Sequence, residues 1–144
     1  MAKYSLVIDL EATCWLKSDP NRKENEIIEI GYALVDENLN VLANEGIFVK
    51  PLLYPTLSDF CIKLTSIKQT DIDSAPLLPL ALDKLKTEIE KSTGSNLSSM
   101  DFISWGNFDK KQFERDCKRH KIPYPFGPHI NLKVEFLRKH KLKS

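Results

Sequence analysis

Two carboxylates inside the most apolar segment of the chain are the residues best suited to do chemistry. Asp9 lies in the run 4–10 (YSLVIDL), whose branched apolar residues predict a strand buried on both faces. A lone ionised carboxylate there costs several kcal/mol unless it is paired, hydrogen-bonded or bound to metal. Glu11 follows two positions later. Because side chains alternate along a strand, we expect both carboxylates on the same side of the sheet, within reach of one ligand.

Such a pair of carboxylates can bind a divalent cation. Two like charges this close repel each other, and sharing a proton or a cation relieves the repulsion. Ligation by carboxylate oxygens alone favours Mg²⁺ or Mn²⁺ over zinc. Acidic pairs at strand ends are usually solvated, however, so Asp9 and Glu11 by themselves leave open both a metal site and a solvated pair.

A third carboxylate, Asp109, strengthens the metal interpretation. It follows a predicted strand, 101–105 (DFISW), through a turn at Gly106 and Asn107, and it opens a basic helix. If that strand runs parallel to the first one, the carboxylate of Asp109 approaches the same sheet edge as Asp9. The alternative is that Asp109 only stabilises the helix N-terminus by its charge, which contributes roughly 0.3–1 kcal/mol.

The strands that must position these carboxylates are predicted to form one sheet. Runs 27–35 (IIEIGYALV) and 41–49 (VLANEGIFV) flank the turn-like segment 36–40 and indicate an antiparallel hairpin. Together with the first strand they form a meander, to which 101–105 adds a fourth strand.

The predicted helices separate or follow these strands. In the longest one, apolar residues recur at steps of three and four, and Gly94 is the expected C-cap. Pro123 ends the basic helix. The order of elements predicts the α/β class, with helices packed on one mixed sheet. We expect helices within 65–72 and over 79–91, 109–121 and 130–139.

Composition limits the classes of protein. The 144 residues suffice for one domain, and 42% hydrophobic with 28% charged residues excludes collagen-like and wholly disordered chains. The formal net charge is +1, yet residues 1–108 hold 10 Lys and Arg against 16 Asp and Glu, whereas 109–144 hold 11 against 4. This asymmetry is expected where an anionic ligand meets carboxylates that need a metal, although an exposed lysine-rich helix and tail explain it equally well.

The expected compartment is the cytoplasm. No apolar run approaches the roughly 18 residues of a membrane span, and the N-terminal segment lacks a signal-peptide pattern. We therefore expect no association with membranes.

The three cysteines, Cys14, Cys61 and Cys117, are far apart and favour neither a disulfide framework nor a zinc site.

Four ordered sequence blocks carry a resemblance to a known family. The first is 7–15 (VIDLEATCW), followed by 25–31 (NEIIEIG), 64–69 (LTSIKQ) and the block formed by 104–109 (SWGNFD) and 113–117 (FERDC). Together they resemble the DEDDh superfamily of 3′→5′ exonucleases, which includes RNase T and the proofreading subunits of DNA polymerases. The wording of the first block is similar to that of histone-mRNA and small-RNA trimming exonucleases and their bacterial KapD-like relatives.

The resemblance implies an RNase H-like α/β fold. Its mixed five-stranded sheet has three antiparallel strands followed by parallel ones, with flanking helices. It also implies two divalent ions, Mg²⁺ or Mn²⁺, roughly 3.5–4 Å apart and held between Asp9, Glu11 and Asp109. In this family chemistry one ion activates water, and the other stabilises the leaving 3′ oxygen.

The same resemblance implies contacts with a nucleic-acid strand. The backbone from Glu11 through Ala12 and Thr13 would hold the terminal ribose, and Thr65 would line the channel for the last nucleotides. Trp15 would offer a stacking surface for a base. For Trp15, a packing role is at least as good an interpretation.

The chain departs from the family at the third motif, a His followed five positions later by an Asp, which supply the general base and a fourth carboxylate. His120 and His129 are followed at that spacing by Pro125 and Val134, and His140 by no residue. We therefore interpret all three as surface histidines. We expect an exonuclease domain truncated before its last motif, with its C-terminal part missing and weak or no activity unless another chain completes it. Its uncovered sheet face would favour self-association.

Three functions follow from these observations. The first is metal-dependent removal of nucleotides from the 3′ end of single-stranded RNA or DNA. The alternative is a catalytically inactive module that binds nucleic acid in the same groove and on a basic face. A protein-interaction scaffold that uses the uncovered sheet face is the third. The basic face comprises Lys110, Lys111, Arg115, Lys118 and Arg119.

Overall fold

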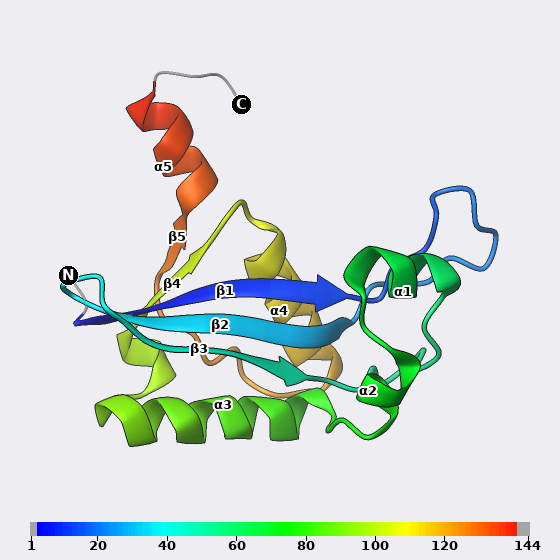
Figure 1. Ribbon diagram of the computed structural model, residues 1–144, viewed down its shortest axis with the longest axis horizontal. Helices are drawn as coiled ribbons and strands as arrows, with labels where there is room; N and C mark the ends of the chain where they lie inside the picture. Colours follow the sequence, from blue (N-terminus) through cyan, green and yellow to red (C-terminus); the bar gives the residue numbers. More distant parts are fainter. Residues whose placement is uncertain (1–2, 141–144) are drawn as a thin grey trace.

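Five strands form one mixed sheet in the computed structural model, which describes residues 3–140. The spatial order is β3-β2-β1-β4-β5 (Figure 1), with antiparallel pairing from β3 to β1 and parallel pairing from β1 to β5. The predicted α/β class, the meander and the mixed five-stranded sheet are confirmed. The strands are β1 (Tyr4–Ala12), β2 (Ile27–Asp36), β3 (Val41–Phe48), β4 (Asp101–Ser104) and β5 (His129–Asn131).

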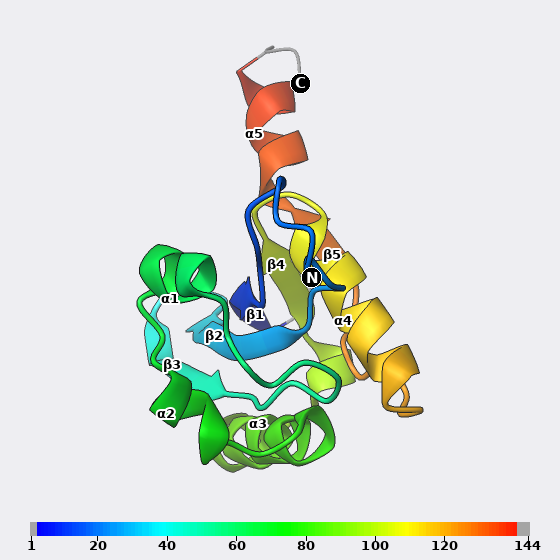
Figure 2. The same ribbon diagram turned by 90° about the vertical axis from the view of Figure 1, so that its right-hand side faces the viewer.

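Helices cover one face and one end of this sheet. The two longest, α3 and α4, contribute to the same core cluster as the buried side of β1 and lie on one side of the sheet (Figures 1 and 2). Two short helices, α1 and α2, lie at the end where β1 terminates, whereas α5 projects away from the body (Figure 1). No helix within residues 3–140 is long and apolar enough to cross a membrane. The helices are α1 (Asp59–Thr65), α2 (Gln69–Asp73), α3 (Leu78–Thr93), α4 (Phe108–Arg119) and α5 (Leu132–Lys139), with a 3₁₀ turn at Leu97–Ser99.

The alternation of β1 decides where its carboxylates point. Leu6, Ile8 and Leu10 are buried in the core beneath α3 and α4. The residues between them face the other side of the sheet, where Val7 is half-buried and Asp9 is exposed. The prediction that this strand is buried on both faces is therefore wrong, because α3 and α4 cover only one face.

Two predicted helices differ from the structure. The segment 65–72 holds no single helix, because Ser66 adopts a left-handed conformation (φ 63°) that ends α1 before α2 begins. The predicted helix 130–139 begins only at α5, because its first residues pair with β4 as β5. The expected C-cap at Gly94 is confirmed by its φ of 71°.

Candidate functional site

The C-terminal end of β1 presents Asp9 and Glu11 on the open face of the sheet. Asp9 is exposed and Glu11 is half-buried. On the neighbouring strand β2, Gly31 lies opposite Asp9, and a Cβ there would come within 2.9 Å of the Asp9 carbonyl oxygen. Glycine thus allows β2 to approach the β1 backbone closely beside the first carboxylate.

Asp109 joins this pair from the first turn of α4. β4 pairs with β1 only over residues 5–7, which leaves the next part of the β1 edge free. There the backbone N–H of Leu10 lies near the Asp109 carboxyl, which is buried. Burial raises the pKa of Asp109 to about 6, the nearby Leu10 N–H opposes that rise, and the charges of Asp9 and Glu11 add to it. The structure therefore places the three predicted carboxylates close enough for their charges to interact.

A fourth carboxylate, Glu29, was missed by the sequence reasoning. The β1–β2 register places it directly opposite Glu11, on the same face. Burial, followed by the charges of Asp9 and Asp71, raises the pKa of Glu29. Burial, followed by the charges of Asp9 and Glu29, likewise raises the pKa of Glu11. The sequence did contain a signal for Glu29. Side chains alternate along β2, so pairing this strand with β1 would have placed Glu29 on the same face as Glu11.

The chemistry of these donors fits a hard divalent cation. All are carboxylate oxygens, and their mutual repulsion is what a cation would relieve. As the side chains stand, residues 3–140 contain no group of three or more His, Cys, Asp or Glu side chains close enough to hold a metal ion. Ligation by Asp9, Glu11 and Asp109 therefore requires their side chains to turn toward one another.

A cavity of about 230 Å³ opens beside the carboxylates. Leu64 from α1 and Phe108 from α4 line it, and both side chains are substantially exposed, at 66% and 48%. Exposed apolar surfaces on two elements around one cavity suit a flat aromatic ring such as a nucleobase. The cavity is lined by Leu10, Glu11, Ala12, Thr13, Cys14, Asn25, Leu64, Thr65 and Phe108.

The predicted substrate-binding residues are placed differently from one another. Ala12, Thr13 and Thr65 line the cavity, whereas Trp15 is half-buried and is not among the lining residues. The Thr13 side chain is buried, and its Oγ1 accepts a hydrogen bond from the Glu26 N–H at 2.9 Å. The Thr65 hydroxyl donates to the Cys61 carbonyl of its own helix at 2.8 Å. Both hydroxyls therefore serve the protein's own structure, and a substrate role for these residues stays a prediction.

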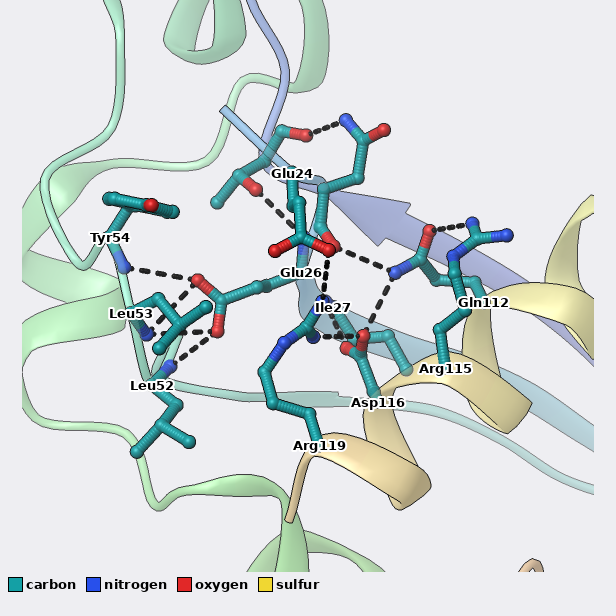
Figure 3. A network of polar contacts seen from close by, with 12 residues as sticks. Glu24, Glu26, Ile27, Leu52, Leu53, Tyr54, Gln112, Arg115, Asp116 and Arg119 are labelled. Atoms are coloured by element: carbon teal, nitrogen blue, oxygen red, sulfur yellow. Dashed lines mark hydrogen bonds and ion pairs between the residues drawn. The ribbon is translucent and has the colours of Figure 1, made fainter. Parts of the chain in front are cut away.

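A buried carboxylate, Glu26, fixes the loop that follows β3 (Figure 3). It is 2% exposed, and its two oxygens accept hydrogen bonds from the backbone N–H groups of Leu52, Leu53 and Tyr54 at 2.7–3.2 Å. The backbone N–H and carbonyl of Glu26 bond Thr13. Glu26 thus ties the loop to the end of β1 that carries the site.

A second buried carboxylate, Asp116, ties α4 to the same place (Figure 3). It accepts hydrogen bonds from the Ile27 N–H at 2.7 Å, the Gln112 amide at 3.0 Å and Arg119 at 2.6 Å. Gln112 also donates to the Asn25 carbonyl at 3.0 Å. These bonds hold α4, and with it Asp109, in place against β2. The role of Asp116 was missed because the bond that ties it to β2, from the Ile27 N–H, spans 89 residues of the sequence.

Two of the three histidines, His120 and His129, are half-buried and differ from the predicted surface positions. His129 on β5 is half-buried; its Nε2 lies 2.7 Å from the Ser104 hydroxyl, and its ring packs on Phe102 with centroids 5.0 Å apart. The surface prediction is wrong there because the parallel pairing of β5 with β4 draws the ring inward. His120 is also half-buried, at the end of α4, and His140 is exposed.

Comparison with known proteins identifies an exonuclease relationship. The family model described as RNase_T, Exonuclease, matches residues 6–141. ERI1 exoribonuclease 2 of Homo sapiens is 29% identical over 139 residues, covering 85% of this chain and 20% of the relative. The 3′-5′ exonuclease eri1 of Schizosaccharomyces pombe is 36% identical over 102 residues, covering 70% and 34%. The chain therefore spans between 20% and 34% of the length of these relatives.

A solved structure agrees with the fold at higher coverage. The nuclease domain of 3′hExo, a DEDDh family member bound to rAMP, superposes with a TM-score of 0.85 and 28% sequence identity. The match covers 99% of this chain and 72% of that domain's chain. DEDDh exonucleases generally use divalent metal ions, which agrees with the chemistry of the carboxylates at the end of β1.

Proposed function

The chain belongs to the RNase_T family of exonucleases, in the DEDDh superfamily, and we propose that it removes nucleotides from the 3′ end of single-stranded RNA or DNA. The observation that carries this proposal is the meeting of Asp9, Glu11 and Asp109 beside a cavity large enough for part of a nucleotide. Neither feature alone would indicate hydrolysis, but acidic metal ligands next to a base-sized cavity do.

The three carboxylates would hold two Mg²⁺ or Mn²⁺ ions, which supply an activated water and stabilise the leaving 3′ oxygen. The residues of the chain hold and orient these groups. Burial keeps Asp109 in a fixed place and raises its pKa to about 6 in the metal-free chain, so below that pH a cation must displace a proton in order to bind there. Asp9, which is exposed, can turn toward Asp109 and Glu11 without losing a buried contact.

The cavity would hold the terminal nucleotide. Leu64 and Phe108 offer apolar surface to its base, and the backbone from Glu11 to Thr13 borders its sugar. Thr65, at the end of α1, also lines the cavity. Trp15 adds a stacking surface only if its half-buried ring turns outward.

Catalysis by these 144 residues is proposed to be weak. No His in the sequence is followed five positions later by an Asp, so nothing in the chain matches the family's general base. Loss of a general base lowers a rate by about 10²–10⁴-fold. We propose that residues 1–144 form one exonuclease domain whose full rate needs a base supplied from elsewhere.

A binding module without hydrolysis is the second candidate, and the basic residues of α4 favour it.

Self-association is a separate proposal. The open face of the sheet carries half-buried apolar side chains on neighbouring strands, which a second copy would cover. These side chains are Val7, Ala33, Ile103 and Ile130.

An oligonucleotide assay tests the proposed function. The chain is mixed with single strands labelled at the 3′ end, either free or blocked at the 3′ hydroxyl, in Mn²⁺ or in EDTA. Release of labelled mononucleotides from the free end, only with Mn²⁺ and not by Asp9→Asn, supports the exonuclease. A salt-sensitive mobility shift without release supports the binding module. Hydrolysis that proceeds equally in EDTA would contradict the metal mechanism.

A further inference from the structure

Helix α4 has two sharply different sides. Its inner side buries Asp109, Gln112, Phe113, Asp116 and Cys117 against the sheet. The opposite side carries Lys111, Arg115 and Lys118, which recur at steps of four and three and are all exposed. We call these three residues the outer stripe of α4.

The outer stripe carries positive charge that the protein itself does not neutralise. Two of the three acids of α4 are buried, and Glu114 is the only exposed one. Within residues 3–140, no carboxylate lies within 4.0 Å of the amino groups of Lys111 and Lys118, and Arg115 donates only to the Gln112 amide oxygen. By contrast, Arg119 is paired with Asp116. Three basic residues of the C-terminal quarter therefore share one outward surface on which, within residues 3–140, no carboxylate pairs with them.

The outer stripe begins one turn of α4 beyond the residue that lines the cavity. Phe108, the first residue of α4, lines the cavity wall, and Lys111 and Arg115 follow it at three and seven positions, on the same side of the helix. From Phe108 to Lys118 the helix rises about 15 Å. A polyanion that leaves the cavity beside Phe108 thus meets cations at each of the next turns.

We propose that the outer stripe of α4 binds the backbone phosphates of a single strand, upstream of the 3′-terminal nucleotide held in the cavity. This inference rests on the proposed function for the position of the 3′ end. Phosphodiester chains are favoured over acidic peptides because the stripe begins at a cavity whose apolar walls suit a base. The stripe then acts on affinity for long substrates and leaves the reacting groups untouched.

Binding measurements on the full chain test this proposal. The triple variant Lys111→Gln, Arg115→Gln, Lys118→Gln is compared with a matched control of equal charge change on α3, Lys84→Gln, Lys86→Gln, Lys91→Gln. Fluorescence anisotropy in EDTA gives Kd for a labelled 15-nucleotide uridine strand and for a 3-nucleotide strand, from 50 to 300 mM salt. Thermal unfolding by circular dichroism confirms that both variants are folded.

We expect the outer-stripe variant to bind the 15-mer at least about tenfold more weakly than the α3 control. Its slope of log affinity against log salt should fall by about 2, from three lost phosphate contacts on a single strand. Binding of the 3-mer should not change. Equal salt slopes in the two triple variants, or an equal loss for the 3-mer, would overturn the proposal.

A 15-residue polyglutamate competitor separates nucleic acid from acidic protein. If it displaces the 15-mer as well as unlabelled uridine strand does, the surface binds acidic peptides and the proposal is wrong. The proposed function fails separately: if no strand is hydrolysed with Mn²⁺ while the stripe-dependent salt slope remains, hydrolysis is excluded and the phosphate-binding surface is supported.

Discussion

Two sets of acidic side chains lie close together in this fold, and their surroundings are opposite. Glu26 and Asp116 each accept several hydrogen bonds, from backbone N–H groups, an amide and a guanidinium. Within residues 3–140, the carboxylates of Asp9 and Glu11 accept no hydrogen bond, and their charges add to the rise that burial causes in the pKa of Asp109. The first set holds the chain together, whereas the second stores repulsion that a cation can relieve. Residue type alone does not separate an anchor from a ligand; the supply of donors does.

The largest expected effect on stability comes from removing Glu26, an acid of the first set. Glu26→Ala leaves the N–H groups of Leu52, Leu53 and Tyr54 without their acceptor and should lower the free energy of unfolding by about 3–5 kcal/mol. Urea denaturation at constant m-value measures this. Glu24→Ala is the control, because its side chain is 68% exposed, and a change below about 0.5 kcal/mol is expected. Similar losses in the two variants would remove Glu26 as an anchor.

Changing Asp109, whose pKa the second set helps to raise, should stabilise the metal-free protein instead of destabilising it. Asp109→Asn removes a buried charge that Asp9 and Glu11 repel, so the metal-free protein at pH 7 should gain about 1 kcal/mol in free energy of unfolding. The measurement is urea denaturation in EDTA. Asp83→Asn on the exposed side of α3 is the matched control and should change little. A loss of stability in Asp109→Asn would mean that this carboxylate is an anchor as well.

The pH dependence of that gain follows from the direction of the pKa shift. Asp109 has a pKa of about 6 in the folded chain against an ordinary value of 3.8, so the folded state holds the proton more tightly. The stability it contributes is complete below pH 3.8 and is lost as the pH rises through 6. The advantage of Asp109→Asn should therefore vanish near pH 4 and be full near pH 7.5. Comparing the two proteins in EDTA at pH 4, 5.5 and 7.5 measures it; a constant difference would refute the assignment.

The smallest expected effect concerns Glu29. It faces Glu11 across the β1–β2 pair, and like charges in that arrangement destabilise a sheet by about 0.2–1 kcal/mol. Glu29→Gln should raise the metal-free melting temperature slightly, measured by circular dichroism, and should leave Mn²⁺ binding nearly unchanged. Should Mn²⁺ binding disappear in this variant, Glu29 would join the ligands.

Most of the sheet could be predicted because short apolar runs and turn residues in the sequence mark its strands. The apolar runs of β1, β2 and β3 and the turn between the last two predict the meander, and Gly94 marks the end of α3. β5 could not be predicted from its own residues, since three residues carry no periodicity and their pairing with β4 is decided by tertiary contacts. The end of α1 at Ser66 could not be predicted either, because serine has no special preference for the left-handed conformation that Ser66 adopts.

The site divides in the same way. Asp9 and Glu11 could be found because a charge inside an apolar strand needs a reason, and Asp109 because it follows a strand. Glu26 and Asp116 could not be told from surface acids, because the backbone N–H groups that bind them lie 26–28 and 89 residues away in the sequence. Carboxylates that require distant donors are visible only once the chain is folded.

The most direct test of this account is the stability gained from Mn²⁺ in wild type, Asp109→Asn and Asp83→Asn. At a free Mn²⁺ concentration about a hundredfold above its Kd, binding to the folded state alone adds about 2.7 kcal/mol, which raises the melting temperature by several degrees. We predict that rise for the wild type and for Asp83→Asn, and little or none for Asp109→Asn. An equal rise in all three proteins would contradict the account, because it would show that Asp109 is not a ligand of the bound ion.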